Sequence, residues 1–126
     1  MENIAVDRRS MKPARPWVAE YPPGVPADVQ IDERMTLVDV LDAAFREYAT
    51  RDACACMGER LKFADVDRLS QDLAAWLQHR NLERGARVAL MMPNLPQYSV
   101  AIAAVLRAGY AVVNVNPLYT PRELEH

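Results

Sequence analysis

Two short apolar segments separated by a helical pattern constrain the fold of this chain more than any other feature. The segments are RVALMM (87–92) and YAVVNV (110–115), and neither alternates between apolar and polar residues. A strand has this continuous composition when helices cover both of its faces, as in a parallel sheet. Between the segments, apolar side chains recur at helical spacing at Tyr98, Ala101, Ile102, Val105 and Leu106. The pattern predicts a strand–helix–strand unit with parallel strands.

The ends of the helix between these strands carry recognisable signals. Asn94 is a preferred N-cap residue, Pro96 falls in the first turn, and Gln97 stands three residues after the cap. Gly109 suits the left-handed position that follows many helices, because glycine has no Cβ to clash there. We therefore expect the helix to be capped by Asn94 and to end before Gly109.

Two further helices and a hairpin are expected before this unit. Thr36 and Asp39 form a plausible capping pair, followed by an apolar face at Leu37, Leu41, Ala44, Phe45 and Tyr48. A second apolar stripe comprises Val66, Leu69, Leu73, Trp76 and Leu77. Between the two helices, ACACM (53–57) and RLKF (60–63) flank Gly58-Glu59 and are typical of a short hairpin.

The first 35 residues differ from the rest of the chain. Five of the nine prolines lie here, at positions 13, 16, 22, 23 and 26. Proline fixes φ and removes a backbone donor, so we expect an extended or irregular N-terminal arm over residues 1–35. Trp17, Tyr21 and Val25 could anchor it to a surface, whereas residues 1–12 have no such anchors and are expected to be mobile. The predicted fold class is α/β: a partial doubly wound parallel sheet (βαβ unit) with flanking helices and this arm.

Composition excludes several classes of protein. A net charge of −2 and a pI near 5.7 argue against a nucleic-acid-binding protein, which would carry a basic stripe. Two cysteines give no disulfide framework. No segment reaches the roughly 18 apolar residues of a membrane span, and the N-terminus lacks the apolar core of a secretory signal. We expect a reducing, cytoplasmic setting.

No phosphate-binding loop is visible in the sequence. Many nucleotide enzymes bind phosphate through clustered glycines, which allow backbone N–H groups to approach closely. The four glycines here stand at positions 24, 58, 85 and 109, so neither GxGxxG nor GxxxxGK[ST] occurs. The fold class suits a nucleotide enzyme, but the loop that would hold its phosphates is absent.

The cysteines and histidines are candidate reactive groups. Cys54 and Cys56 stand two apart on a predicted strand and therefore point to one face. A metal or redox pair is one interpretation, but zinc usually takes four ligands, so two small buried side chains are favoured. His79 ends a predicted helix, where the helix dipole alone explains a cation, and His126 is terminal. Neither histidine has a triad partner.

Polar residues on one predicted helix and after the last predicted strand are further candidates. Asp65, Asp67 and Asp72 resemble a solvated helix face rather than a metal site. Asn114, Asn116 and Tyr119 follow the carboxyl end of a parallel strand, which is the ligand-binding side of open α/β sheets. A turn-forming role for Asn116 with Pro117 is nevertheless favoured.

The segment TPRELEH (120–126) has the signals of a new helix. Thr120 is a suitable cap, Pro121 occupies the first helical position, and Glu123 can reach back to the cap. Isolated helices shorter than about 12–15 residues are marginal in water, so we expect this helix to continue in a longer protein.

Several of these stretches resemble a known family. The sequence from Gly85 to His126, and LRAG and VVNVNPLYTPRELEH in particular, closely resembles the N-terminal part of bacterial long-chain fatty-acid–CoA ligases of the adenylate-forming, AMP-binding superfamily. The arm segment RPWVAEYPPGVP resembles the start of those ligases. Positions Ala86 and Lys62-Phe63 depart from the family's usual residues. The likeness runs from about Arg15 to His126.

The resemblance implies a two-step reaction in which a fatty acid and MgATP form an acyl-adenylate, and CoA then releases AMP. In the family, the phosphate loop and the C-terminal catalytic lysine lie downstream, so no catalytic, cofactor-binding or metal residue is assigned here. Residues 36–126 are expected to be the first βα units of a truncated N-terminal domain. ATP, Mg and CoA would serve only the full-length enzyme, and the fragment is expected to be inactive and to self-associate. One alternative function is left open: a stand-alone acyl-binding or interaction module derived from such a ligase. Peripheral association with the inner membrane is also left open.

Overall fold

The computed structural model describes residues 15–125, in two parts that meet between Asp32 and Glu33. The expectations for residues 1–12 and His126 lie outside these residues. In the first part, a 3₁₀ helix, η1, spans Pro16–Glu20, and Arg15 pairs with Asp28 farther along. The remainder is irregular, as predicted from its prolines. The proposed anchors are exposed: Trp17, Tyr21 and Val25.

The second part begins with the predicted helix, α1, over Leu37–Glu47. The backbone N–H of Asp39 donates to Oγ1 of Thr36 at 3.2 Å, and the N–H of Thr36 donates to the Asp39 carboxylate at 2.8 Å. The capping box is therefore confirmed. Hydrogen bonds from the side chain and backbone of Thr36 hold the pKa of Asp39 below its usual value.

The predicted hairpin is present but shifted by one residue. Strands β1 (Asp52–Cys56) and β2 (Glu59–Lys62) pair antiparallel. The turn of the hairpin is Met57-Gly58, with φ values of 50° and 89°. Two-residue hairpin turns favour positive φ at both positions because that geometry matches the twist of the flanking strands. The prediction was wrong for Phe63, which begins the next helix rather than ending a strand. The Asp65 carboxylate accepts the Lys62 N–H at 3.0 Å and starts that helix.

The second helix, α2 (Phe63–Gln78), buries a narrower face than predicted. Its buried residues are Val66, Ser70, Ala74 and Leu77. Trp76 is 52% exposed, so its place in the buried stripe was wrong. Two residues of the buried face, Ser70 and Ala74, have small side chains. They allow Ala103 and Ala104 of the neighbouring helix to pack closely against α2.

The strand–helix–strand unit is confirmed. Strands β3 (Arg87–Leu90) and β4 (Ala111–Asn114) pair in parallel, and helix α3 (Pro96–Arg107) connects them. After α3 the N–H of Gly109 donates to Leu106 O and the N–H of Tyr110 donates to Val105 O, both at 3.0 Å. Gly109 has a φ of 84°, so the predicted left-handed helix end is a Schellman motif.

The start of α3 differs from the prediction. Its N-cap residue is Leu95, and no side chain caps the helix. The residue before a proline avoids helical backbone angles, so Pro96 at the first helical position makes Leu95 the last extended residue. Asn94 is therefore one residue too early to cap the helix.

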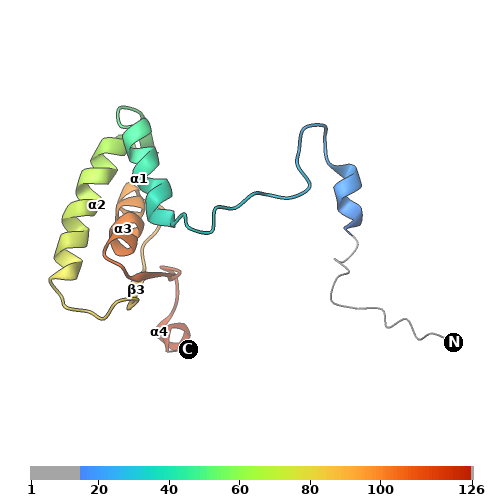
Figure 1. Ribbon diagram of the computed structural model, residues 1–126. Coiled ribbons are helices and arrows are strands. Elements are labelled where there is room, and N and C mark those ends of the chain that lie inside the picture. Colours follow the sequence, from blue (N-terminus) through green and yellow to red (C-terminus); the bar gives the residue numbers. More distant parts are fainter. Residues whose placement is uncertain (1–14, 126) are drawn as a thin grey trace. The chain divides into compact units, whose positions relative to one another are not determined.

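Helix α3 is buried around most of its circumference and forms the centre of the second part (Figure 1). One core cluster joins it to α2 and β3 through residues that include Leu77, Leu90 and Val105. Another joins it to α1 and α2 through Phe45, Val66, Val100 and Ala103. Helices cover one sheet face, whereas Ala89 and Val113 on the other face are exposed in the described residues.

The chain described by the structure ends with helix α4 (Pro121–Leu124). The Glu123 carboxylate accepts the backbone N–H of Thr120 at 2.8 Å and its hydroxyl at 2.7 Å. These hydrogen bonds lower the pKa of Glu123 and confirm the helix start predicted from TPRE.

Candidate functional site

The carboxyl edge of the β3–β4 sheet is the candidate site, because open α/β sheets bind ligands there. Asn114 ends β4 at this edge. The hydroxyl of Tyr98, in the first turn of α3, donates to Oδ1 of Asn114 at 2.6 Å. Asn114 therefore lies where the sequence placed it. The sequence predicted Tyr98 only as part of the apolar face of the helix, although in a βαβ unit the helix that follows a strand begins at this edge of the sheet.

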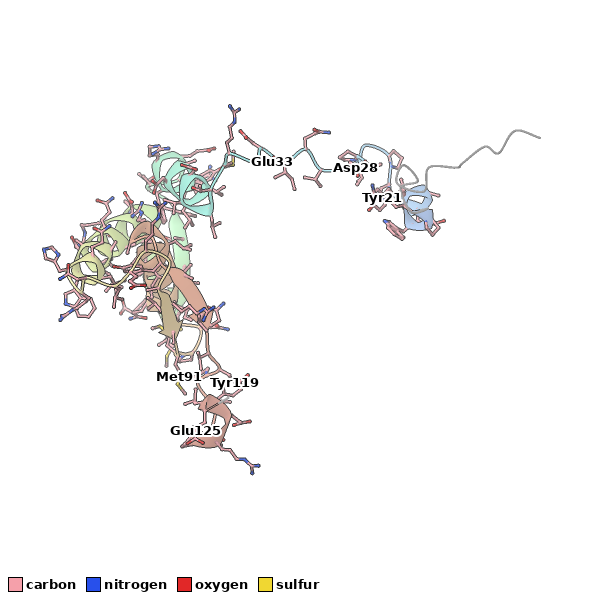
Figure 2. The ribbon with its side chains drawn as sticks, turned by 60° about the horizontal axis from the view of Figure 1, so that its bottom comes forward. Tyr21, Asp28, Glu33, Met91, Tyr119 and Glu125 are labelled. Atoms are coloured by element: carbon pink, nitrogen blue, oxygen red, sulfur yellow. The ribbon has the colours of Figure 1, made fainter. Side chains whose placement is uncertain are left out.

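The other two residues predicted at this edge lie in the loop after β4. Oδ1 of Asn116 accepts the N–H of Leu118 at 3.0 Å, and the Asn116 carbonyl accepts the N–H of Tyr119 at 3.0 Å. The turn-forming role favoured for Asn116 is thus confirmed. Tyr119 is 44% exposed. Figure 2 shows it with Met91, at the end where both strands finish.

A shallow cleft of about 230 Å³ lies between β1 and the start of α3. Cys54 and Cys56 line it from the strand, as the two-residue spacing predicted, and both are free and half-buried. From the helix side it is lined by Asn94, Leu95, Pro96, Tyr98 and Ser99. The cleft therefore presents two thiols, two hydroxyls and an amide.

No metal site is evident in this part of the chain. Across residues 15–125, no three side chains of His, Cys, Asp or Glu gather closely enough to bind an ion. Nδ1 of His79 lies 2.7 Å from the carbonyl oxygen of Ala75, at the end of α2. Asp72 is exposed and pairs with Arg68 at 3.6 Å. The contacts of His79 and Asp72 are thus typical of structural residues.

Asp67 is not part of a solvated face, contrary to the prediction. Arg107, at the end of α3, donates from Nη2 to Oδ1 of Asp67 at 2.5 Å and to Asp42 of α1. Its Nη1 donates to Oγ of the buried Ser70 at 2.7 Å and to Asp67 O at 2.9 Å. The Arg107 guanidinium also lies 4.9 Å from the centre of the Phe45 ring. We call Asp42, Asp67, Ser70 and Arg107 the Arg107 cluster.

Electrostatics within the Arg107 cluster favour the charged forms. Burial lowers the pKa of Arg107, but hydrogen bonds to Asp42 and Asp67 outweigh burial and raise it above its ordinary value. Burial likewise raises the pKa of Asp67, yet hydrogen bonds from Arg107 and Gln71 lower it overall. The cluster joins α1, α2 and α3 at the end of α3 opposite Tyr98, which indicates a structural role.

The residues at the carboxyl edge can form hydrogen bonds but show no acid–base pair. The hydroxyl of Tyr98 is already directed at Asn114. The four glycines, at positions 24, 58, 85 and 109, each have a positive φ and lie far apart in the sequence. A phosphate cradle needs several successive backbone N–H groups directed at one point.

None of the helices within residues 15–125 combines the length and the apolar composition that a bilayer crossing requires.

Comparison with known proteins gives consistent matches. The family model described as "AMP-binding enzyme" matches residues 41–126. A long-chain-fatty-acid–CoA ligase of Salmonella typhimurium is 50% identical over 111 residues, which cover 87% of this chain and 20% of that ligase. The chain thus spans about a fifth of the length of the curated relatives that it matches.

Solved structures match the same fold. The apo structure of Mycobacterium smegmatis MbtA matches with a TM-score of 0.68 and 32% identity, covering 73% of this chain and 18% of that one. The Klebsiella oxytoca NpsA N-terminal subdomain has a TM-score of 0.67 at 22% identity, covering 71% and 23%. The latter likeness concerns the fold alone.

Proposed function

Because this chain belongs to the AMP-binding enzyme family, we propose that it is the N-terminal part of a long-chain fatty-acid–CoA ligase. The observation that carries the proposal is the 50% identity to such a ligase over most of this chain. In this proposal, residues 1–35 form the arm and residues 36–126 form the first βα units of the large N-terminal domain. The complete protein would convert a fatty acid, CoA and ATP to acyl-CoA, AMP and pyrophosphate, with Mg²⁺.

In the proposed ligase, this chain serves as a structural scaffold and supplies no reacting group. The Arg107 cluster holds α1, α2 and α3 together. At the carboxyl edge of the sheet, Tyr98 of α3 is hydrogen-bonded to Asn114 of β4. Since the four glycines lie far apart in the sequence, we assign no chemical step to a side chain here, and we propose that the 126-residue chain is inactive alone.

Two measurements test the proposal. In the first, the purified chain is incubated with ATP, Mg²⁺ and palmitate, and we expect no pyrophosphate release; turnover would overturn the inactivity. In the second, residues 16–126 replace the matching segment of the Salmonella typhimurium ligase. We expect the chimera to make palmitoyl-CoA, whereas the same ligase without the segment should not. A folded but inactive chimera would contradict the proposal.

A stand-alone acyl-binding module is less well supported. The cleft beside Cys54 and Cys56 measures about 230 Å³, below the roughly 300–1,000 Å³ of typical ligand pockets. Calorimetric titration with palmitate should therefore show no saturable binding to the isolated chain, and stoichiometric binding would favour the module instead.

Self-association of the isolated chain is also proposed. The sheet of β3 and β4 has two strands in the described residues, so each strand has one unpaired edge. Exposed edges and apolar side chains such as Val113 promote association. Sedimentation velocity should show species larger than a monomer whose fraction increases with concentration, and a monomer at all concentrations would contradict this expectation.

The proposed setting of the complete protein is cytoplasmic, with peripheral association with the inner membrane.

A further inference from the structure

The two cysteines of strand β1 have no role in the proposed function. We propose that Cys54 and Cys56 together form a two-coordinate site for the soft monovalent cation Cu(I). The proposal takes up the metal interpretation of this pair that the sequence raised, with two thiolates as the complete ligand set. It does not depend on the ligase reaction.

The two thiols lie on one face of a regular stretch of strand. Cys54 lies opposite Leu61 in the β1–β2 pairing. Cys56 lies opposite Glu59, and no bulge separates the two cysteines. Side chains two positions apart on a strand point to the same face. Both cysteines are free and half-buried and line the same cleft, so their sulfurs are directed toward one volume.

The spacing of the pair favours a bridging cation over a disulfide. Side chains two positions apart on a strand have Cβ atoms roughly 6–7 Å apart, whereas a disulfide needs about 3.5–4.5 Å. Two metal–thiolate bonds of about 2.3 Å in line place the sulfurs roughly 4.6 Å apart. Each sulfur then has to shift only about 1 Å toward the other, which rotation of the side chains permits.

The lining of the cleft suits a soft cation and not a hard one. Its remaining lining residues are uncharged, namely Ala55, Asn94, Leu95, Pro96, Tyr98 and Ser99. The cleft therefore offers no carboxylate for Mg²⁺ or Ca²⁺. Structural zinc takes four ligands, and residues 15–125 contain no cluster of even three His, Cys, Asp or Glu side chains. Thiolates select soft ions such as Cu(I), and an in-line site needs only two of them.

The start of α3 favours the charge of the complex. When Cu(I) binds, two S–Cu bonds form and both thiol protons leave to solvent, so the complex carries one negative charge. Leu95, the N-cap residue of α3, lines the cleft, and no side chain caps this helix. The partial positive charge of a helix N-terminus stabilises an anion nearby. The uncapped start of α3 consequently favours the complex over two neutral thiols.

Anaerobic titration with Cu(I) tests the site. The complete chain is made to compete for Cu(I) with the chromophoric chelator bathocuproine disulfonate. We expect one ion per chain, with about two protons released per ion, and X-ray absorption should show two sulfur ligands. Cys54→Ser and Cys56→Ser should each weaken binding at least about 100-fold, since even the hydrogen-bond partners of metal ligands contribute about 10–100-fold. Unchanged binding in either variant would overturn the proposal.

A matched control moves one thiol and keeps the number of thiols the same. Cys56→Ala combined with Ala55→Cys leaves two cysteines on β1 but on opposite faces. Ala55 is exposed, so the fold should tolerate the change, and circular dichroism checks that it does. We expect this variant to bind Cu(I) as weakly as the single-cysteine variants. Affinity equal to that of the native pair would overturn the site and identify adventitious thiol binding.

Two further measurements examine the ligand set and the spacing. Met57→Leu removes the neighbouring thioether, which is 95% exposed in the turn, and should leave Cu(I) affinity unchanged within about threefold. A larger loss would contradict a two-thiolate site. After mild oxidation, mass spectrometry should show no disulfide between Cys54 and Cys56 within one chain. Formation of that disulfide would contradict the spacing on which the site depends. Ligase activity of the chimera is a separate readout, so either proposal can fail without the other.

Discussion

Nη2 of Arg107 lies 2.5 Å from Oδ1 of Asp67, across 40 positions of sequence. The same nitrogen donates to Asp42, so the last residue of α3 is tied to both α1 and α2. The Arg107 side chain is 12% exposed, whereas the two carboxylates are about one-third exposed. This arrangement gives the guanidinium hydrogen-bond partners at the junction of α1, α2 and α3.

Replacing Arg107 by methionine should destabilise the fold by about 1–3 kcal/mol, because two carboxylates lose their charged donor. The cost should be below that of a fully buried pair, since both carboxylates can regain water. The free energy of unfolding in urea measures the effect. Arg68→Met is the matched control: its pair with Asp72 is exposed and 3.6 Å long, so a change below about 0.5 kcal/mol is expected. Equal losses would contradict a special role for Arg107.

The Arg107 cluster should also make stability depend on acid pH. The pKa of Asp67 is lower in the folded chain because hydrogen bonds from Arg107 and Gln71 outweigh burial. Its contribution is therefore present above the unfolded pKa of about 3.9 and is lost as the pH falls through the folded value. Asp67→Asn should remove about 1 kcal/mol at most near pH 7 and flatten the acid limb of a stability–pH profile. In an Arg107→Met background the same substitution should have little further effect.

Gly109→Ala should cost about 1–2 kcal/mol, because an L residue is strained at the φ of 84° found there. An added Cβ would meet nothing within 4 Å, so the cost comes from the backbone and not from a clash. Gly24→Ala is the matched control, with a φ of 90° in the arm. Gly24 belongs to the first compact unit, so the substitution should leave the thermal unfolding of residues 33–125 unchanged. A loss like that of Gly109→Ala would contradict this expectation.

The two helix starts provide a paired test of capping. Thr36→Ala should destabilise α1 by about 1 kcal/mol, because Oγ1 of Thr36 accepts the Asp39 N–H. Asn94→Ala should change stability by less than about 0.5 kcal/mol, since no side chain caps α3. Urea unfolding of both variants measures the difference. A larger loss of stability for Asn94→Ala would support the capping role of Asn94 that the sequence predicted.

How much of the candidate site could be predicted depended on the range of the interactions involved. The turn at Asn116 was predictable because the Asn116 side chain accepts the backbone N–H of Leu118, only two residues later. Asn114 was placed at the correct edge by strand direction alone. Its partner Tyr98 was not identified as a site residue, because their hydrogen bond spans 16 positions and requires the strand and helix to be assembled.

The sequence by itself determined the local elements: the capping box of α1, the hairpin, the glycine-ended α3 and the parallel βαβ order. The capping box, the hairpin turn and the helix end follow from interactions between residues a few positions apart, which are the same in any tertiary surrounding. The parallel order follows from the pattern of two continuous apolar segments joined by a helical crossover. Only the tertiary structure decided which face of α2 is buried, and hence that Trp76 is exposed and Asp67 is bound to Arg107. Periodicity identifies an apolar face, but the small side chains that let two helices approach closely determine where that face lies against its neighbour.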